Sequence, residues 1–108
     1  MTLGNAKANA VLAVFFDMFR EKAYKLHVEA YVNGREQGFC LNNYTSNRKV
    51  SFSEDRRSDS IVVYFGFGND FSMQGNVPSE EVYRKSAKDF KYNEYEKAAQ
   101  FIHDMLIM

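Results

Sequence analysis

Cys40, the only cysteine, and His27 are the residues of this sequence that could perform nucleophilic chemistry together. An imidazole beside a thiol can act as its base. An Asn33-Gly34 turn between two alternating segments would place the two side chains opposite each other on neighbouring strands. No third side chain that would orient the imidazole is evident. We therefore interpret the pair as incidental and predict that the protein is not an enzyme.

The sequence gives still weaker signals for a metal site or a nucleotide-binding site. The two histidines, His27 and His103, have no cysteine or carboxylate at the spacing of metal ligands, so the sequence predicts no metal site. A Gly-Phe-Gly run at 66–68 follows a strand-like segment, as phosphate-binding turns do, but it lacks a following Lys-Ser/Thr pair and an immediate helix. We predict no cofactor, and a small nucleotide or ligand site in the loop 66–77 stays open as an alternative.

Three groups of side chains are suited to contact a protein partner. The loop 54–59 (EDRRSD) is wholly polar, and the loop 66–77 carries apolar side chains where loops usually carry polar ones. Tyrosines lie on the predicted sheet face opposite the core, and tyrosine and arginine are favoured at interface hot spots. The candidate contact residues are Arg56, Arg57, Asp59, Tyr31, Tyr64, Phe71 and Met73. The alternatives are a solvated hairpin tip with self-compensating charges, and a sheet face covered by a helix or, in a homodimer, by a second copy.

Composition limits the class of protein. Hydrophobic residues make up 45% of the chain, with ten Phe and seven Tyr, which is enough to close a core. Fourteen basic residues balance fourteen acidic ones. This balance argues against a nucleic-acid binder, which normally has a basic excess. A lone cysteine and the lack of a signal-peptide cleavage pattern after the apolar run 10–16 favour the reducing cytoplasm, and that run is too short to span a membrane.

The pattern of apolar residues predicts one α+β domain of 108 residues. Period-two alternation predicts two hairpins, over 24–44 and 48–67, with Val28 opposite Phe39 in the first. Helical periodicity predicts a helix over 5–21, and capping residues predict two more that begin at Ser79 and at Asn93. We expect a four-stranded antiparallel sheet packed by the N-terminal helix and the two C-terminal helices.

Two segments of the sequence resemble a known class of protein. They are NRKVSFSEDRRSDSIVVYFG at 47–66 and GNVPSEEVYRKSAKDFKYNEYEKAAQFI at 75–102. Both are similar to stretches of small bacterial immunity proteins that accompany contact-dependent or polymorphic toxins. The resemblance implies a non-enzymatic inhibitor that binds one cognate toxin and blocks its active site or an essential surface. It assigns no functional residue, and a phage-type inhibitor of a host defence protein is the alternative among binding proteins.

Overall fold

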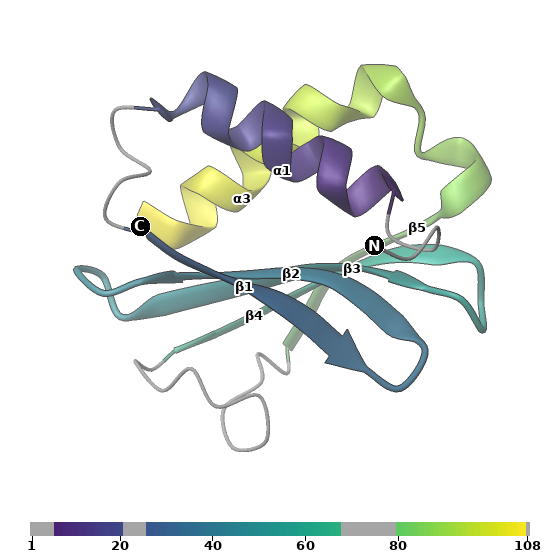
Figure 1. Cartoon of the computed structure of the whole chain (residues 1–108), viewed down its shortest axis with the longest axis horizontal. Helices are drawn as coiled ribbons and strands as arrows, with labels where there is room; N and C mark the ends of the chain where they lie inside the picture. The colour runs from purple at the N-terminus through teal and green to yellow at the C-terminus, as the bar shows by residue number, and fades with distance from the viewer. Residues whose placement is uncertain (1–5, 21–25, 68–79, 108) are drawn as a thin grey trace.

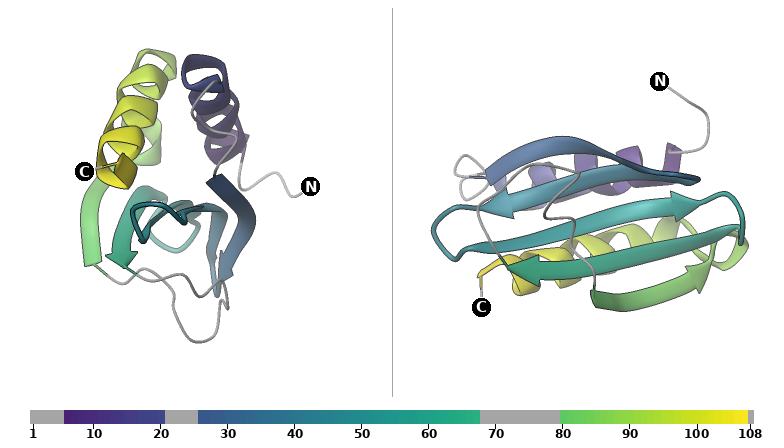
Figure 2. Two further views of the ribbon diagram at one scale, coloured as in Figure 1. Left: turned by 90° about the vertical axis from the view of Figure 1, so that its left-hand side faces the viewer. Right: turned by 90° about the horizontal axis from the view of Figure 1, so that it is seen from below.

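The computed structural model describes residues 6–20, 26–67 and 80–107, which form an α+β domain (Figure 1). The elements are α1 (Ala6–Met18), β1 (Leu26–Asn33), β2 (Glu36–Asn43), β3 (Arg48–Asp55), β4 (Ser60–Phe67), β5 (Glu80–Ser86), the short 3-10 turns η2 (Ala87–Asp89) and η3 (Tyr92–Glu94), and α3 (Tyr95–Ile107). The strands form one antiparallel sheet in the order β1-β2-β3-β4-β5. Both helices lie on the same face of this sheet (Figure 2). The predicted α+β class is confirmed.

The prediction of four strands and two C-terminal helices is wrong, because the segment after Ser79 is the fifth strand. The capping residue Ser79 had suggested a helix there. In the structure Val63 pairs with Tyr83 but Tyr64 pairs with Glu81, so Val82 is the extra residue of a β-bulge. Val82 and Tyr83 both pack against the core. The bulge therefore hides the period-two alternation that would have identified the strand in the sequence.

The first hairpin forms as predicted, but its register differs by two residues. Gly34, with a φ of 62°, is the first central residue of the turn rather than the second, as in a type II′ turn. Val28 consequently lies opposite Leu41 instead of Phe39. A shift of two residues keeps every side chain on its predicted face of the sheet.

The hydrophobic core lies between the helices and the sheet. α1 buries Ala8, Val11 and Phe15, and α3 buries Ala99, Ile102 and Leu106. These side chains pack against the residues of all five strands that face the helices. The buried ones among these strand residues are Phe39, Leu41, Val50, Phe52, Ile61 and Val63. Each buried Phe, Leu, Ile or Val side chain contributes about 1.5–3 kcal/mol relative to an exposed one. No helix in the described part of the chain has the length and apolar character needed to cross a membrane.

The start of α1 is held by a carboxylate from the sheet. One oxygen of Glu54, on β3, accepts hydrogen bonds from the backbone N–H groups of Lys7 and Ala8, each at 3.1 Å. The Lys7 ammonium donates in turn to the carbonyl oxygens of Ala87 and Phe90, the latter at 3.0 Å. A residue predicted to lie in a polar loop thus satisfies orphan donors of the first helical turn. The predicted cap, Asn5, lies outside the described residues.

Candidate functional site

The sheet face turned away from the helices, called the polar face here, is rich in polar side chains that are nevertheless buried. Its buried members are Tyr31, Cys40, Asn42, Lys49, Ser51, Ser53, Ser60 and Val62. The strand register aligns Glu29, Cys40, Ser51 and Tyr64 in one row across β1 to β4. Burial of polar groups is costly unless they are hydrogen-bonded, so this face differs from an ordinary solvated sheet surface.

The predicted thiol–imidazole neighbours are not opposite each other. His27 faces Asn42, and Cys40 faces Glu29, because the turn at Gly34 sets the register. Burial raises the pKa of the Cys40 thiol to about 12. The thiol is therefore protonated at neutral pH, whereas nucleophilic cysteines have a lowered pKa.

Tyr31 and Tyr64 both lie on the polar face, as predicted, but neither is a freely exposed side chain. Tyr31 is only 1% exposed and so offers a partner no surface in this state. Tyr64 is half-buried, and burial raises its pKa, with the hydrogen-bonded Glu36 carboxylate adding to the effect. Both tyrosines are thus packed on the polar face, and their prediction as contact residues stays a prediction.

Three buried oxygen atoms of the polar face have no hydrogen-bond partner among the described residues. They are Oδ1 of Asn42, Oγ of Ser51 and Oε2 of Glu29. Such atoms are ordinarily satisfied by ordered water or by a ligand. All three atoms can accept a hydrogen bond.

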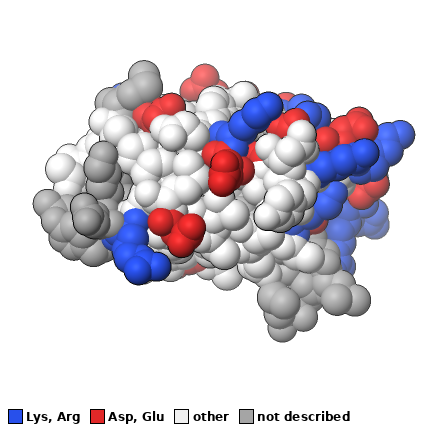
Figure 3. Space-filling model, turned by 90° about the horizontal axis from the view of Figure 1, so that it is seen from above, with Lys and Arg blue, Asp and Glu red and all other residues white. Residues whose placement is uncertain are grey.

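Three exposed arginines meet at one end of the molecule, and we call Arg35, Arg56 and Arg57 the arginine end. Arg35 belongs to the β1–β2 turn, and the other two belong to the β3–β4 turn. The turns are joined by a hydrogen bond from the backbone N–H of Arg56 to the carbonyl oxygen of Arg35, at 3.1 Å. Lys and Arg gather at this end in the space-filling view (Figure 3).

The β3–β4 turn that presents Arg56 and Arg57 is rigidly built. Oδ1 of Asp55 accepts the backbone N–H of Arg57 at 2.9 Å, and Oδ2 accepts the hydroxyl of Ser58 at 3.0 Å. Asp59 closes the turn with a φ of 52°, in the left-handed region that Asp and Asn tolerate better than most residues. Asp59 thus has a conformational role, and its prediction as a contact residue stays a prediction.

Another cation near this turn is already paired. Arg84, on β5, binds Glu81 with an N–O distance of 2.8 Å and lies 4.0 Å from Asp55. The hydrogen bond from Arg84 lowers the pKa of Glu81. In the described part of the chain, none of the three arginines of the arginine end forms an ion pair. Their charges are therefore available to a partner.

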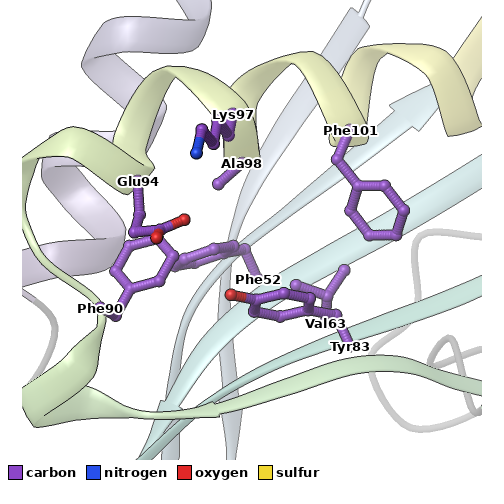
Figure 4. Close-up of a pocket in the computed structure, with 8 residues that line it drawn as sticks. All are labelled: Phe52, Val63, Tyr83, Phe90, Glu94, Lys97, Ala98 and Phe101. Atoms are coloured by element: carbon purple, nitrogen blue, oxygen red, sulfur yellow. The ribbon is translucent and has the colours of Figure 1, made fainter.

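Two features of the structure had no counterpart among the sequence predictions: the position of Arg35 and a pocket beside β5. Arg35 follows the Asn-Gly pair directly, but its proximity to Arg56 depends on the order of the strands. A mostly apolar pocket of about 140 Å³ lies between β5 and α3 (Figure 4), lined by Phe52, Val63, Tyr83, Phe90, Glu94, Lys97, Ala98 and Phe101. It is smaller than the usual ligand site of about 300–1,000 Å³. With β5 predicted as a helix, this pocket had no signal in the sequence.

The predicted contact residues Phe71 and Met73 lie outside the described residues, as does most of the loop 66–77. Within the described ranges, no three His, Cys, Asp or Glu side chains lie close enough to share a metal ion. Comparisons with protein families, with curated proteins and with solved structures gave no match. The case for a function therefore depends on the geometry of this chain.

Proposed function

We propose that this protein acts without catalysis, by binding another protein in a stoichiometric complex through the arginine end. The observation that carries the proposal is the meeting of three exposed arginines, none ion-paired among the described residues, on two turns joined by a backbone hydrogen bond. Arginine is enriched in binding hot spots because its planar guanidinium forms several hydrogen bonds with a carboxylate. A fixed backbone beneath such side chains lowers the entropic cost of binding.

The arginine end suits an acidic protein surface better than a nucleic acid. Acidic side chains lie beside the arginines, with Asp55 and Asp59 in or next to the same turn and Glu81 on the adjacent strand. A continuous phosphate backbone would be repelled by these carboxylates, and the chain as a whole has no net charge. A protein surface can instead place its own cations opposite them.

The specific activity that we propose is neutralisation of a cognate bacterial toxin. Support comes from the resemblance of 47–66 and 75–102 to immunity proteins, and the first of these segments contains Arg56 and Arg57. Many immunity proteins of nuclease toxins are acidic and match a basic toxin face, from which this neutral chain departs; the arginine end would instead match a toxin with an acidic contact surface. The free thiol of Cys40 suits action in the reducing cytoplasm.

Co-expression with a toxin tests this function. The product of a toxin gene adjacent to the gene for this chain should lose its growth inhibition when the chain is co-expressed. The two purified proteins should elute together from a sizing column at a fixed ratio. Absence of both rescue and co-elution would contradict toxin neutralisation. Rescue by a variant in which all three arginines are changed to Glu would contradict the role of the arginine end.

A further inference from the structure

The two edge strands of the sheet differ in how they are protected from pairing with another strand. The β5 edge carries a bulge and four charged side chains, Glu80, Glu81, Arg84 and Lys85. Bulges and charges are the devices by which proteins block edge-to-edge association. β1 pairs with β2 along all eight of its residues with no shift in register, and no described strand pairs with its other edge. With one carboxylate, Glu29, and no bulge, the β1 edge is less protected than the β5 edge.

β1 also exposes a row of apolar side chains on the face that carries the helices. Val28 is 37% exposed, Val32 is 61% exposed, and Ala30 between them is exposed. They stay uncovered because the helices pack mainly over β2 and β3. β1 forms the rim of the sheet in the view from below (Figure 2). An apolar row along an open edge is a surface that another strand could bury.

The backbone groups of the same residues point away from β2. A two-residue hairpin loop is closed by a hydrogen-bonded pair, here Asn33 and Glu36. Hydrogen-bonded positions alternate along an antiparallel ladder, so the N–H and C=O groups of Val28, Ala30 and Val32 face outward. The apolar row and the free backbone donors and acceptors thus coincide on three alternate residues.

We propose that the occupant of this edge is β1 of a second copy of the chain, antiparallel and centred on Ala30. In this register Ala30 pairs with Ala30 of the second copy, and Val28 pairs with Val32 of the second copy. All of these residues have outward backbone groups, so the pairs are hydrogen-bonded and join the two sheets into one of ten strands. The small Ala30 side chain lies at the two-fold axis.

Charge disfavours one of the two neighbouring registers. A ladder centred on Glu29 would place two carboxylates opposite each other with Cα atoms about 4.5 Å apart, and like charges in that position are destabilising. Centring on Ala30 places Glu29 opposite Tyr31 of the second copy instead. Among the described residues Oε2 of Glu29 also has no hydrogen-bond partner, since its distance of 3.9 Å from Nε2 of His27 is too long for a hydrogen bond. The chain has no net charge that would oppose self-association.

The dimer does not depend on the proposed partner binding. Antiparallel pairing leaves the arginine ends of the two copies at opposite ends of the joined sheet, so each can bind its own partner. One strand from each copy buries less surface than a standard interface of about 1,600 Å². We therefore expect dissociation in the micromolar range.

Sedimentation velocity of the purified full chain tests the dimer. Between about 1 and about 200 μM, the weight-average mass should rise from the 12.5 kDa of one chain towards twice that value. Val32→Lys should stay monomeric over the whole range. The matched control is Ile107→Lys, which changes an apolar side chain that is 52% exposed at the end of α3, and it should associate as the wild type does. A wild type that stays monomeric at the highest concentration, or equal association of the two variants, would overturn the proposal.

Cross-linking tests the register separately. With a short reagent that joins two thiols, Ala30→Cys should link to itself, and a mixture of Val28→Cys and Val32→Cys should link far more than either variant alone. The wild type is the control for Cys40, which is only 2% exposed. Preferential linking in a mixture of Val28→Cys and Ala30→Cys would indicate the Glu29-centred ladder and overturn the proposed register.

Discussion

The backbone N–H of Arg56 donates to the carbonyl oxygen of Arg35 at 3.1 Å, so that the β1–β2 and β3–β4 turns meet. This contact joins the backbones of two residues that are 21 positions apart in the sequence. It brings together the exposed side chains of Arg35, Arg56 and Arg57 on two turns whose backbones are hydrogen-bonded to each other. The arginine end is therefore a product of the strand order rather than of a basic segment in the sequence.

The role of Asp59 can be tested by its conformation. A residue at a φ of 52° is strained unless it is Gly, Asn or Asp. We expect Asp59→Ala to lower the free energy of unfolding by about 1 kcal/mol, and Asp59→Gly to leave it nearly unchanged. Urea denaturation measures both. Equal loss of stability in the two variants would show that the carboxylate, and not the turn conformation, is what matters at this position.

Gly38 provides a sharp test of the sheet geometry. A Cβ atom at this position would lie 1.9 Å from the carbonyl oxygen of Phe52 and 2.8 Å from Cα of Ser53. Because both are backbone atoms, Gly38→Ala should lower the free energy of unfolding by about 3 kcal/mol or prevent folding. Gly34→Ala is the control: its Cβ would meet no atom within 4 Å, and only the φ of 62° should cost stability, about 1–2 kcal/mol. A Gly38→Ala protein as stable as Gly34→Ala would contradict the packing of β2 on β3.

The capping of α1 by Glu54 predicts both a loss of stability and a pH dependence. Glu54→Ala removes the acceptor of two backbone N–H groups and should cost about 1–2 kcal/mol. Burial raises the pKa of Glu54 above its ordinary value of 4.5, although hydrogen bonds from Ala8 and Lys7 oppose this. The pKa of Glu54 is therefore higher in the folded state than in the unfolded state, so the folded state binds the proton more tightly.

The contribution of Glu54 to the free energy of unfolding must consequently fall as the pH rises from 4.5 through the pKa of Glu54 in the folded state. Glu54→Gln lacks this titration. Urea denaturation of both proteins at several pH values should show the unfolding free energy of the wild type falling relative to that of Glu54→Gln as pH increases. The opposite slope would mean that the hydrogen bonds from α1 outweigh the cost of burying the carboxylate.

The buried thiol of Cys40 should be unreactive. A pKa of about 12, against an ordinary value of 9.0, lowers the thiolate fraction at neutral pH by about a thousandfold. Labelling with a thiol reagent should therefore be at least that much slower than for a free cysteine peptide, and it should accelerate when urea unfolds the chain. A rate equal to that of the peptide would revive a nucleophilic role for this cysteine.

Much of the fold could be predicted from local patterns. Alternation located the strands β1 to β4, apolar periodicity located α1, and the capping residue Asn93 located α3. β5 could not be predicted because the bulge at Val82 breaks its alternation, while its charged residues also fit a helix. The first register was wrong because Asn-Gly favours a turn in which both residues are central, whereas here only Gly34 is.

The candidate site was only partly predictable for a different reason. Arg56 and Arg57 stood out as a charged pair in a polar loop. Arg35 could not be associated with them, because its contact with Arg56 depends on the neighbouring positions of two turns. The burial of Tyr31 likewise depends on the surrounding fold rather than on its own segment.

The dissociation constant of the complex with the cognate toxin tests the central claim most directly. Isothermal titration should give a weakening of at least about tenfold for each change of Arg35, Arg56 or Arg57 to Glu. Arg20→Glu, which makes the same charge change at an exposed residue beyond the far end of α1, should bind as the wild type does. Undiminished affinity of the arginine-end variants, or an equal loss in Arg20→Glu, would contradict the claim that this end is the binding surface.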